Sequence, residues 1–243
     1  MKRILLAGAT LLALTTAQPV LAADAPVYKG PAPYAAAPAY KWTGCYLGLQ
    51  AGLASARTSG EATNGAVTQF LPYSYNATGG LFGAHVGCDM QFAPSIVIGI
   101  EADWNWAGLR GRQDGIEDPI NFPGLFYTHR TTIDSLGSIH GRFGVLVTPS
   151  TLLYATAGWA FGHTVHSLEF TGAPPPFISY AANRSGWSAG LGLETYIMPQ
   201  VTARLVYRFS RLNGGTVGII ANTIDNLNPT NIHAVMVGLT WRP

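Results

Sequence analysis

Residues Gly186–Gly190 read GWSAG, which matches the G-x-S-x-G pattern of a serine nucleophile. That pattern supports covalent catalysis when it lies on a sharp strand-to-helix turn, where the serine hydroxyl is exposed. Here the flanking residues alternate apolar and small or polar at period two, which is typical of a strand interior. Ser188 would then share a row of small side chains with the two glycines, and we do not expect it to be catalytic.

Two histidines in the segment HTVH, His163 and His166, raise the question of a metal site. Residues three apart on a strand point to opposite faces, so a shared metal ion is not expected. His85 and His140 stand alone in their segments, and we expect them to belong to a polar interior. The sequence has no phosphate-binding loop and no clustered cysteine and histidine ligands. We therefore predict no enzymatic activity, no catalytic residue, no cofactor and no metal.

Charged side chains instead fall on one face of alternating segments, as in SIVIGIEADWNWAG. Its isoleucines and tryptophans form one row at period two, and Glu101 and Asp103 belong to the other. A half-buried strand of a soluble sheet has this pattern, and so does a strand between lipid and a polar interior. The same parity groups seven charged residues into one expected interior network: Asp89, Glu101, Asp103, Arg142, Glu194, Arg204 and Arg208. Asp134 and Arg242 fall on the same side of their segments.

Eight alternating segments would position these charges. They are predicted as strands at residues 42–53, 80–92, 96–106, 131–147, 152–165, 185–198, 201–210 and 232–242. Three connections are tight turns marked by Pro94, Pro149 and Pro199. The other four are long, at residues 54–79, 107–130, 166–184 and 211–231. Because outer-membrane barrels alternate short periplasmic turns with long external loops, we predict an all-β, eight-stranded antiparallel up-and-down transmembrane β-barrel.

The first 41 residues have a different character. Residues 1–22 combine a basic start, a short apolar run and a small-residue ending, which predicts a secretory signal peptide cleaved near Ala22. Residues 23–41 are rich in proline and alanine and are predicted to be an extended periplasmic linker, so that the barrel occupies residues 42–243. Cleavage would leave 12 basic and 12 acidic side chains, and charge therefore gives no reason to expect a nucleic-acid partner.

The expected interior is narrow. Eight strands enclose a lumen just wide enough to be filled by side chains, so charges inside it should be paired. Glu194 and Arg204 flank the last tight turn symmetrically, and we expect them to form an ion pair. Arg142 should lie level with Glu101 and Asp103. The favoured interpretation is a salt-bridged core that specifies the barrel, and a narrow or gated conduction path lined by the same charges is the alternative.

Aromatic residues near the strand ends are expected to form girdles at the two membrane interfaces. The external girdle would contain Trp104, Trp106 and Trp187, and the periplasmic one Trp42, Phe92 and Trp241. The only two cysteines, Cys45 and Cys88, share outward parity and similar height on strands that should be neighbours. In an oxidising compartment they could form a disulfide, and the alternative is a pair of thiols acting as small apolar residues.

Five stretches of the chain are distinctive as a set: KWTGCYLGLQAG, IVIGIEADWNWAG, GRFGVLVTPSTLLYATAGWAFG, SGWSAGLGLETYIMPQVTARLVYRFS and HAVMVGLTWRP. Together they resemble the small outer-membrane immunogenic proteins of alphaproteobacteria, often labelled porin-family proteins. The resemblance covers residues 42–243 and implies an eight-stranded barrel in the Gram-negative outer membrane that supports envelope integrity and exposes antigenic loops. It brings no catalytic residues.

The chain departs from that family pattern in two places. Members typically end in an aromatic residue that the barrel-assembly machinery reads, whereas this chain ends WRP, so that Trp241 would serve instead of Pro243. Val206 stands where members commonly have an acid, which thins the inward charges of that strand.

We predict a structural outer-membrane barrel with four long surface loops able to contact the environment or a host. Its expected partners are outer-membrane lipids, the barrel-assembly machinery through the C-terminal strand, and surface ligands on the loops. A narrow porin-like solute channel is the alternative. A soluble lipocalin-like carrier would need an apolar cavity and a polar exterior, the reverse of the parity found here. A barrel-embedded lipid-modifying enzyme would need a His/Ser pair near the outer rim, which the sequence does not assemble.

Overall fold

The computed structural model describes residues 40–64, 67–68, 73–118, 122–170, 178–220 and 223–243. The expected signal peptide, and the expected linker up to residue 39, lie outside these described residues. No helix in the described ranges is long and apolar enough to cross a membrane. All strand pairings within the same ranges are antiparallel.

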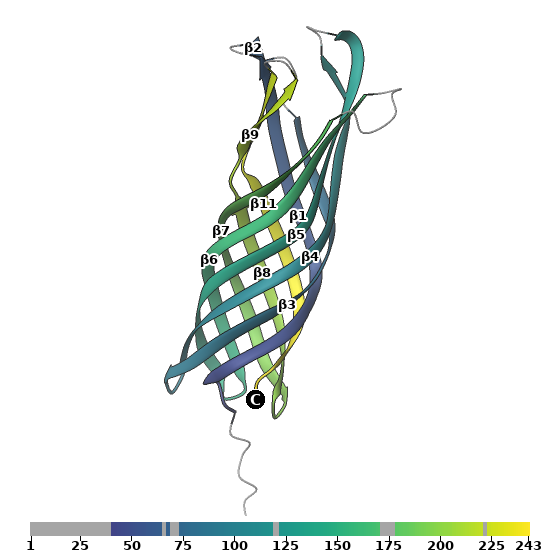
Figure 1. Cartoon of the computed structure of the whole chain (residues 1–243). Coiled ribbons are helices and arrows are strands. Elements are labelled where there is room, and N and C mark those ends of the chain that lie inside the picture. The colour runs from purple at the N-terminus through teal and green to yellow at the C-terminus, as the bar shows by residue number, and fades with distance from the viewer. Residues whose placement is uncertain (1–39, 65–66, 69–72, 119–121, 171–177, 221–222) are drawn as a thin grey trace, which may run out of the picture. The chain divides into compact units, whose positions relative to one another are not determined.

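Eight long strands close into a ring, which Figure 1 shows as steeply tilted ribbons. They are β1 (Gly44–Asn64), β3 (Tyr73–Ala93), β4 (Ile96–Asp118), β5 (Phe122–Thr148), β6 (Thr151–Phe170), β7 (Ile178–Met198), β8 (Val201–Leu212) and β11 (Thr230–Trp241). Each pairs with the next along the chain, and β11 pairs back onto β1, so the ring has no open edge. The short strands β2 (Val67–Thr68), β9 (Gly215–Ile220) and β10 (Thr223–Leu227) extend the sheet beyond β1. The eight-stranded up-and-down barrel is confirmed.

Three tight turns lie at one end of the ring. They contain Pro94, Pro149 and Pro199, and they join β3 to β4, β5 to β6 and β7 to β8. The C-terminus lies at the same end (Figure 1). Backbone bonds tie each turn to a neighbouring strand: Leu146 N to Ser95 O at 2.8 Å, Tyr196 N to Ser150 O at 2.9 Å and Arg242 N to Gln200 O at 2.8 Å. In an outer-membrane barrel the end with short turns is periplasmic.

The strands continue well beyond their predicted ends on the opposite side. Residues 107–130 were expected to be a loop, yet β4 and β5 run through most of them, and only residues 119–121 separate the two strands. Thr58 is buried within the extension of β1, and Tyr73 stacks on His129 with ring centroids 4.3 Å apart. Threonine and aromatic side chains pack well across paired strands, so a polar composition that suggested loops instead continues the sheet.

Side chains alternate between the two faces of the barrel wall. The outward rows carry large apolar residues that are widely exposed, among them Leu53 at 72% and Ile100 at 67%. A soluble monomer rarely exposes so continuous an apolar surface, whereas a barrel wall facing hydrocarbon requires one. The residues that the sequence predicts to face lipid therefore form this outer wall, with one exception.

One exception is Ile133, which was assigned to the lipid row, with Asp134 assigned to the interior. Ile133 is fully buried and Asp134 is exposed. The pairing of β5 with β6 shifts between Ile133 and Ser135, and the pairing of β4 with β5 shifts at the same place. A bulge inserts one unpaired residue and reverses the faces beyond it, so the parity extended from residues 139–147 was wrong there.

Candidate functional site

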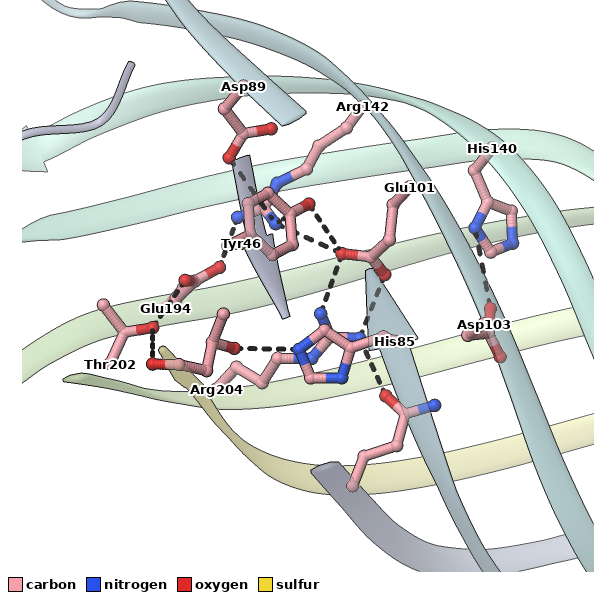
Figure 2. A network of polar contacts seen from close by, with 12 residues as sticks. Tyr46, His85, Asp89, Glu101, Asp103, His140, Arg142, Glu194, Thr202 and Arg204 are labelled. Atoms are coloured by element: carbon pink, nitrogen blue, oxygen red, sulfur yellow. Dashed lines mark hydrogen bonds and ion pairs between the residues drawn. The ribbon is translucent and has the colours of Figure 1, made fainter. Parts of the chain in front are cut away.

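The lumen contains a network of eight charged side chains, part of which Figure 2 shows from close by. Four are carboxylates and four are guanidiniums: Asp89, Glu101, Asp103, Glu194, Arg142, Arg204, Arg208 and Arg242. Each residue is at most 6% exposed. The seven charged residues that the sequence predicts for the interior all lie in this network. Arg242, near the end of β11, is the eighth member. The formal charges cancel, which is the condition for burying so many ions in a narrow space.

Glu101 is the hub of this network (Figure 2). Arg204 donates from Nη1 to Oε2 at 2.8 Å and from Nη2 to Oε1 at 3.0 Å. Arg142 Nη1 lies 3.3 Å from the same Oε2, and the Tyr46 hydroxyl donates to it at 2.9 Å. Both oxygens of Glu101 therefore accept charge-assisted hydrogen bonds, the strong class of such bonds.

The expected ion pair between Glu194 and Arg204 does not form. The two residues are directly opposite each other in the β7–β8 register, as predicted. Glu194, however, is occupied by Arg142 on one oxygen and, on the other, by Arg242 Nε at 3.0 Å and the Thr202 hydroxyl at 2.6 Å. Arg204 consequently reaches across the lumen to Glu101. The lumen is narrow enough for the Arg204 side chain to bind Glu101 on the opposite wall instead of Glu194 on the adjacent strand.

Asp103 holds the outer part of the network. Arg208 Nη1 lies 2.7 Å from both of its oxygens, and the Ser138 hydroxyl and the Asn105 amide also donate to it. A cavity of about 20 Å³ lies beside this pair, room for about one water.

One group of side chains has the arrangement of a catalytic triad, in which an acid, a histidine and a serine lie in a row: Asp103, His140 and Ser188. His140 Nε2 lies 3.1 Å from Ser188 Oγ, and its Nδ1 lies 3.9 Å from Asp103 Oδ1. Ser188 lies within β7 and is almost fully buried, so a substrate carbonyl has no approach to its hydroxyl. Asp103 is also committed to Arg208. The contact is part of the polar packing of the lumen.

Ligand atoms of Glu101, Asp103 and His140 all lie within 4.8 Å of one another, a spacing that could hold a cation. Both carboxylates are already bound by guanidinium groups, Glu101 by Arg204 and Asp103 by Arg208. A divalent ion would have to displace those arginines and leave them buried without a counter-charge, which is costly. The donor set therefore fits an ion-paired interior better than a metal centre.

Two tyrosines that the sequence analysis did not single out support Arg142. Its guanidinium carbon lies 3.8 Å from the ring centroid of Tyr154 and 5.4 Å from that of Tyr46. The rings have room because glycines face them: a Cβ on Gly192 would lie 2.3 Å from the Tyr154 ring. Tyr46 and Tyr154 both have inward parity, and that parity is the signal that could have found them.

Trp42 was expected in the periplasmic girdle, and this assignment is wrong. Its side chain is only 1% exposed, and its indole nitrogen donates to the Pro149 carbonyl at 3.0 Å. It packs edge-on against Tyr196, and the Arg242 guanidinium lies 4.9 Å from its ring. Trp42 has the same parity as the buried residues Tyr46 and Gln50, so the period of β1 places it inward, and the girdle assignment rested only on its position at the strand end. It packs at the turn end of the lumen instead. The other five girdle residues are exposed on the outer wall: Phe92, Trp104, Trp106, Trp187 and Trp241.

An apolar layer lies beyond the charges, toward the extended ends of the strands. Its large members are Leu81, Leu109, Ile133, Leu212 and Ile232, each 5% exposed or less. On β8, Leu212 lies four residues beyond Arg208, and on β4 Leu109 lies six residues beyond Asp103. Buried side chains therefore fill the lumen at two levels, as an ionic layer and as an apolar one.

Cys45 and Cys88 are directly opposite each other in the β1–β3 register and are joined by a disulfide, with Cα atoms 3.9 Å apart. Both point outward, near the turn end of the barrel. Of the two alternatives left open by the sequence, the structure has the bonded form.

A cluster of histidines and tyrosines fills the barrel beyond the apolar layer, outside the membrane-spanning part of the strands. The Thr131 hydroxyl lies 2.9 Å from His166 Nδ1 and 2.6 Å from the Tyr75 hydroxyl. His166 stacks on Tyr180 and His129 on Tyr73. Burial lowers the pKa of His129 to about 4. Burial, together with Arg184 and His129, lowers the pKa of His166 to about 3.

The two histidines should make the outer extensions sensitive to acid. Both are neutral in the folded extension, so their contribution to stability is fully present above the unfolded pKa of about 6.5. It is lost as the pH falls from there toward the folded values of about 4 and 3, because unfolding then takes up protons. The protection factors of the β5 and β6 amides, which are the intrinsic exchange rates divided by the observed ones, should therefore fall between pH 7 and pH 4. The fall should be smaller in His129→Gln/His166→Gln, and an equal fall in that variant would contradict the assignment.

Comparison with known proteins places this architecture in a family. Residues 9–242 match the family model described as the outer membrane protein beta-barrel domain. The chain is 25% identical to the 31 kDa outer-membrane immunogenic protein of Brucella melitensis over 248 residues, covering 100% of both chains. It is 28% identical to the 25 kDa outer-membrane immunogenic protein of the same organism over 208 residues, 86% of this chain and 83% of that one.

Among solved structures, the outer membrane protein OprG from Pseudomonas aeruginosa is matched at 12% identity with a TM-score of 0.44, over 84% of this chain and 99% of that one. The ring of eight strands, the apolar outer wall and the family match over nearly the whole chain agree with one another. The chain belongs to the outer membrane protein beta-barrel family and resides in the Gram-negative outer membrane.

Proposed function

We propose that this protein is a non-enzymatic, closed barrel that supports the outer membrane mechanically and presents its strand extensions at the cell surface. The observation that supports the proposal best is the filled lumen, in which balanced ion pairs and an apolar layer are both buried from solvent. A rigid, cross-linked interior suits a load-bearing element, because buried ion pairs specify one arrangement of the strands.

The names of the Brucella relatives suggest a further part of this role. Those proteins are called immunogenic, and long strand extensions projecting from the membrane are the part of such a barrel that antibodies or host molecules could reach. We propose that β1, β3, β4 and β5 carry the main surface epitopes beyond the external girdle. We further propose that residues 1–22 act as a signal peptide cleaved near Ala22, that residues 23–41 form a periplasmic linker, and that the C-terminal strand engages the barrel-assembly machinery.

A narrow channel is the competing function, because the lumen contains charges that could bind ions. Planar-bilayer recording with purified protein separates the two. We expect no discrete conductance steps above those of a protein-free bilayer, since an ion would have to cross the layer of Leu109, Ile133 and Leu212.

Regular steps whose cation-to-anion selectivity changes in Asp103→Asn would establish a path through the lumen and refute the closed barrel. Steps that are the same in Asp103→Asn and in wild type would indicate leakage around the protein rather than through it. A matched control is Asp114→Asn, a carboxylate exposed outside the lumen.

A further inference from the structure

Two arginines lie on the outer wall in a row with an asparagine. Arg57 on β1 is directly opposite Asn231 on β11, and Asn231 is directly opposite Arg211 on β8. Cross-strand partners share a face, so the three side chains form one line over three neighbouring strands. We call Arg57, Asn231 and Arg211 the arginine row. Both arginines are exposed, and among the described residues no carboxylate forms an ion pair with either.

The arginine row lies at the outer edge of the lipid-facing band. On β1, Leu53 is the last large apolar residue of the outward row, and Arg57 follows four residues beyond it. On β8, Arg211 is directly opposite Trp187, a residue of the external girdle whose ring lies 5.3 Å from Phe209. Exposed tryptophans of a membrane barrel lie at headgroup level, so the guanidiniums lie at or just above the level of the lipid phosphates.

We propose that the arginine row binds the phosphate groups of lipid A, the phosphorylated glycolipid of the outer leaflet. Guanidinium groups match phosphate oxygens with two parallel donors each, and they are the preferred partners of phosphate in proteins. Neighbouring strands are about 4.8 Å apart, so the two arginines start about 10 Å from each other, with the Asn231 amide between them. Such a row can hold two phosphates of one headgroup. The acyl chains would lie on the exposed apolar wall below, at Leu53 and Val235.

A second group of outward arginines supplies a contrast. Arg112 and Arg130 are directly opposite each other on β4 and β5. Each already has an acidic partner: Arg112 Nε lies 3.4 Å from Asp114, and Arg130 Nη2 lies 3.7 Å from Glu169. Their positive charge is therefore countered within the protein. The arginine row has no such counter-charge among the described residues, which leaves it open to an external anion.

The test uses the full-length protein in a zwitterionic detergent, with bisphosphorylated lipid A as the probe and native mass spectrometry to measure bound lipid. Replacing two arginines near a charged lipid surface should weaken binding about thirtyfold in Arg57→Gln/Arg211→Gln. Arg112→Gln/Arg130→Gln should stay within about twofold of wild type. Heat-modifiable gel mobility would show that every variant is folded, which is expected because all four side chains are outside the lumen.

Three probes distinguish the sources of phosphate. Dephosphorylated lipid A should bind wild type and Arg57→Gln/Arg211→Gln equally, because only the acyl contacts remain. Phosphatidylglycerol and inorganic phosphate should bind wild type far more weakly than lipid A does. The proposal is overturned if phosphatidylglycerol binds as well as lipid A, if both double variants lose the same affinity, or if Arg57→Gln/Arg211→Gln retains wild-type binding.

Discussion

Replacing Glu101 by leucine should lower the free energy of unfolding by about 3–5 kcal/mol, the usual cost of leaving a buried charge without its partner. Glu101 accepts from Arg204 at 2.8 and 3.0 Å and from Arg142 at 3.3 Å, and none of the three residues is reached appreciably by solvent. Without the carboxylate, the lumen carries one uncompensated positive charge. Urea titration in lipid vesicles, followed by tryptophan fluorescence, measures the loss.

The double variant Glu101→Leu/Arg204→Met is the informative companion. It restores neutrality, and Arg142 keeps its contact with Glu194, so the variant should be more stable than Glu101→Leu alone. Asp114→Asn is the surface control. Its partner Arg112 is exposed, and such pairs contribute about 0–1 kcal/mol. A Glu101→Leu protein as stable as Asp114→Asn would show that the network adds nothing to folding.

Gly192→Val should be nearly as damaging, by about 3 kcal/mol, at the upper end of the range for overpacking a filled interior. A Cβ at this position would lie 2.3 Å from Cζ of Tyr154 and 2.5 Å from its hydroxyl. Tyr154 cannot withdraw, because its ring is buried and stacks on Arg142 at 3.8 Å. The same urea titration measures the change, and Tyr154→Leu in the Gly192→Val background should recover part of the loss.

Gly141→Val is the matched control for this substitution. Gly141 faces outward, and a Cβ there would meet nothing closer than the Ala157 carbonyl at 3.8 Å. Valine favours strands and suits a lipid-facing wall, so its effect should stay within about 0.5 kcal/mol of wild type or be stabilising. If both glycine variants lose the same stability, the cause is backbone preference rather than crowding of Tyr154.

The face of a strand on which a side chain lies depends only on its nearest neighbours in the sequence. For this reason much of the barrel could be predicted from the sequence. Glu101 and Asp103 alternate with isoleucine and tryptophan within a few residues, so the face they occupy needs no knowledge of the rest of the chain. Which charged side chains pair with each other, in contrast, depends on residues far apart in the sequence. Arg204 bonds to Glu101, 103 residues away, rather than to Glu194 beside it, because the choice depends on distances across the closed lumen.

The other errors have equally physical causes. The bulge at Asp134 adds one residue to β5, and nothing in the sequence marked it, so every face beyond it was reversed. Trp42 shares the inward parity of Tyr46 and Gln50, and the error was to assign it to the girdle from its position at the strand end alone. The sequence predicts loops at the strand extensions because glycine and asparagine are depleted in strands, and pairing with the neighbouring strands overrides that preference.

The ion pairs of Arg242 bear on how the barrel is assembled. It is the penultimate residue of the chain, and it reaches Asp89 at 2.8 Å across a separation of 153 residues. Until β11 joins β1, Asp89 and Glu194 lack one of their counter-charges, and an open sheet in hydrocarbon would expose that imbalance to lipid. We therefore expect insertion and closure to be coupled, because a sheet without β11 lacks the guanidinium that balances Asp89 and Glu194. The charges of the lumen balance only when β11 is paired with β1 in its native register.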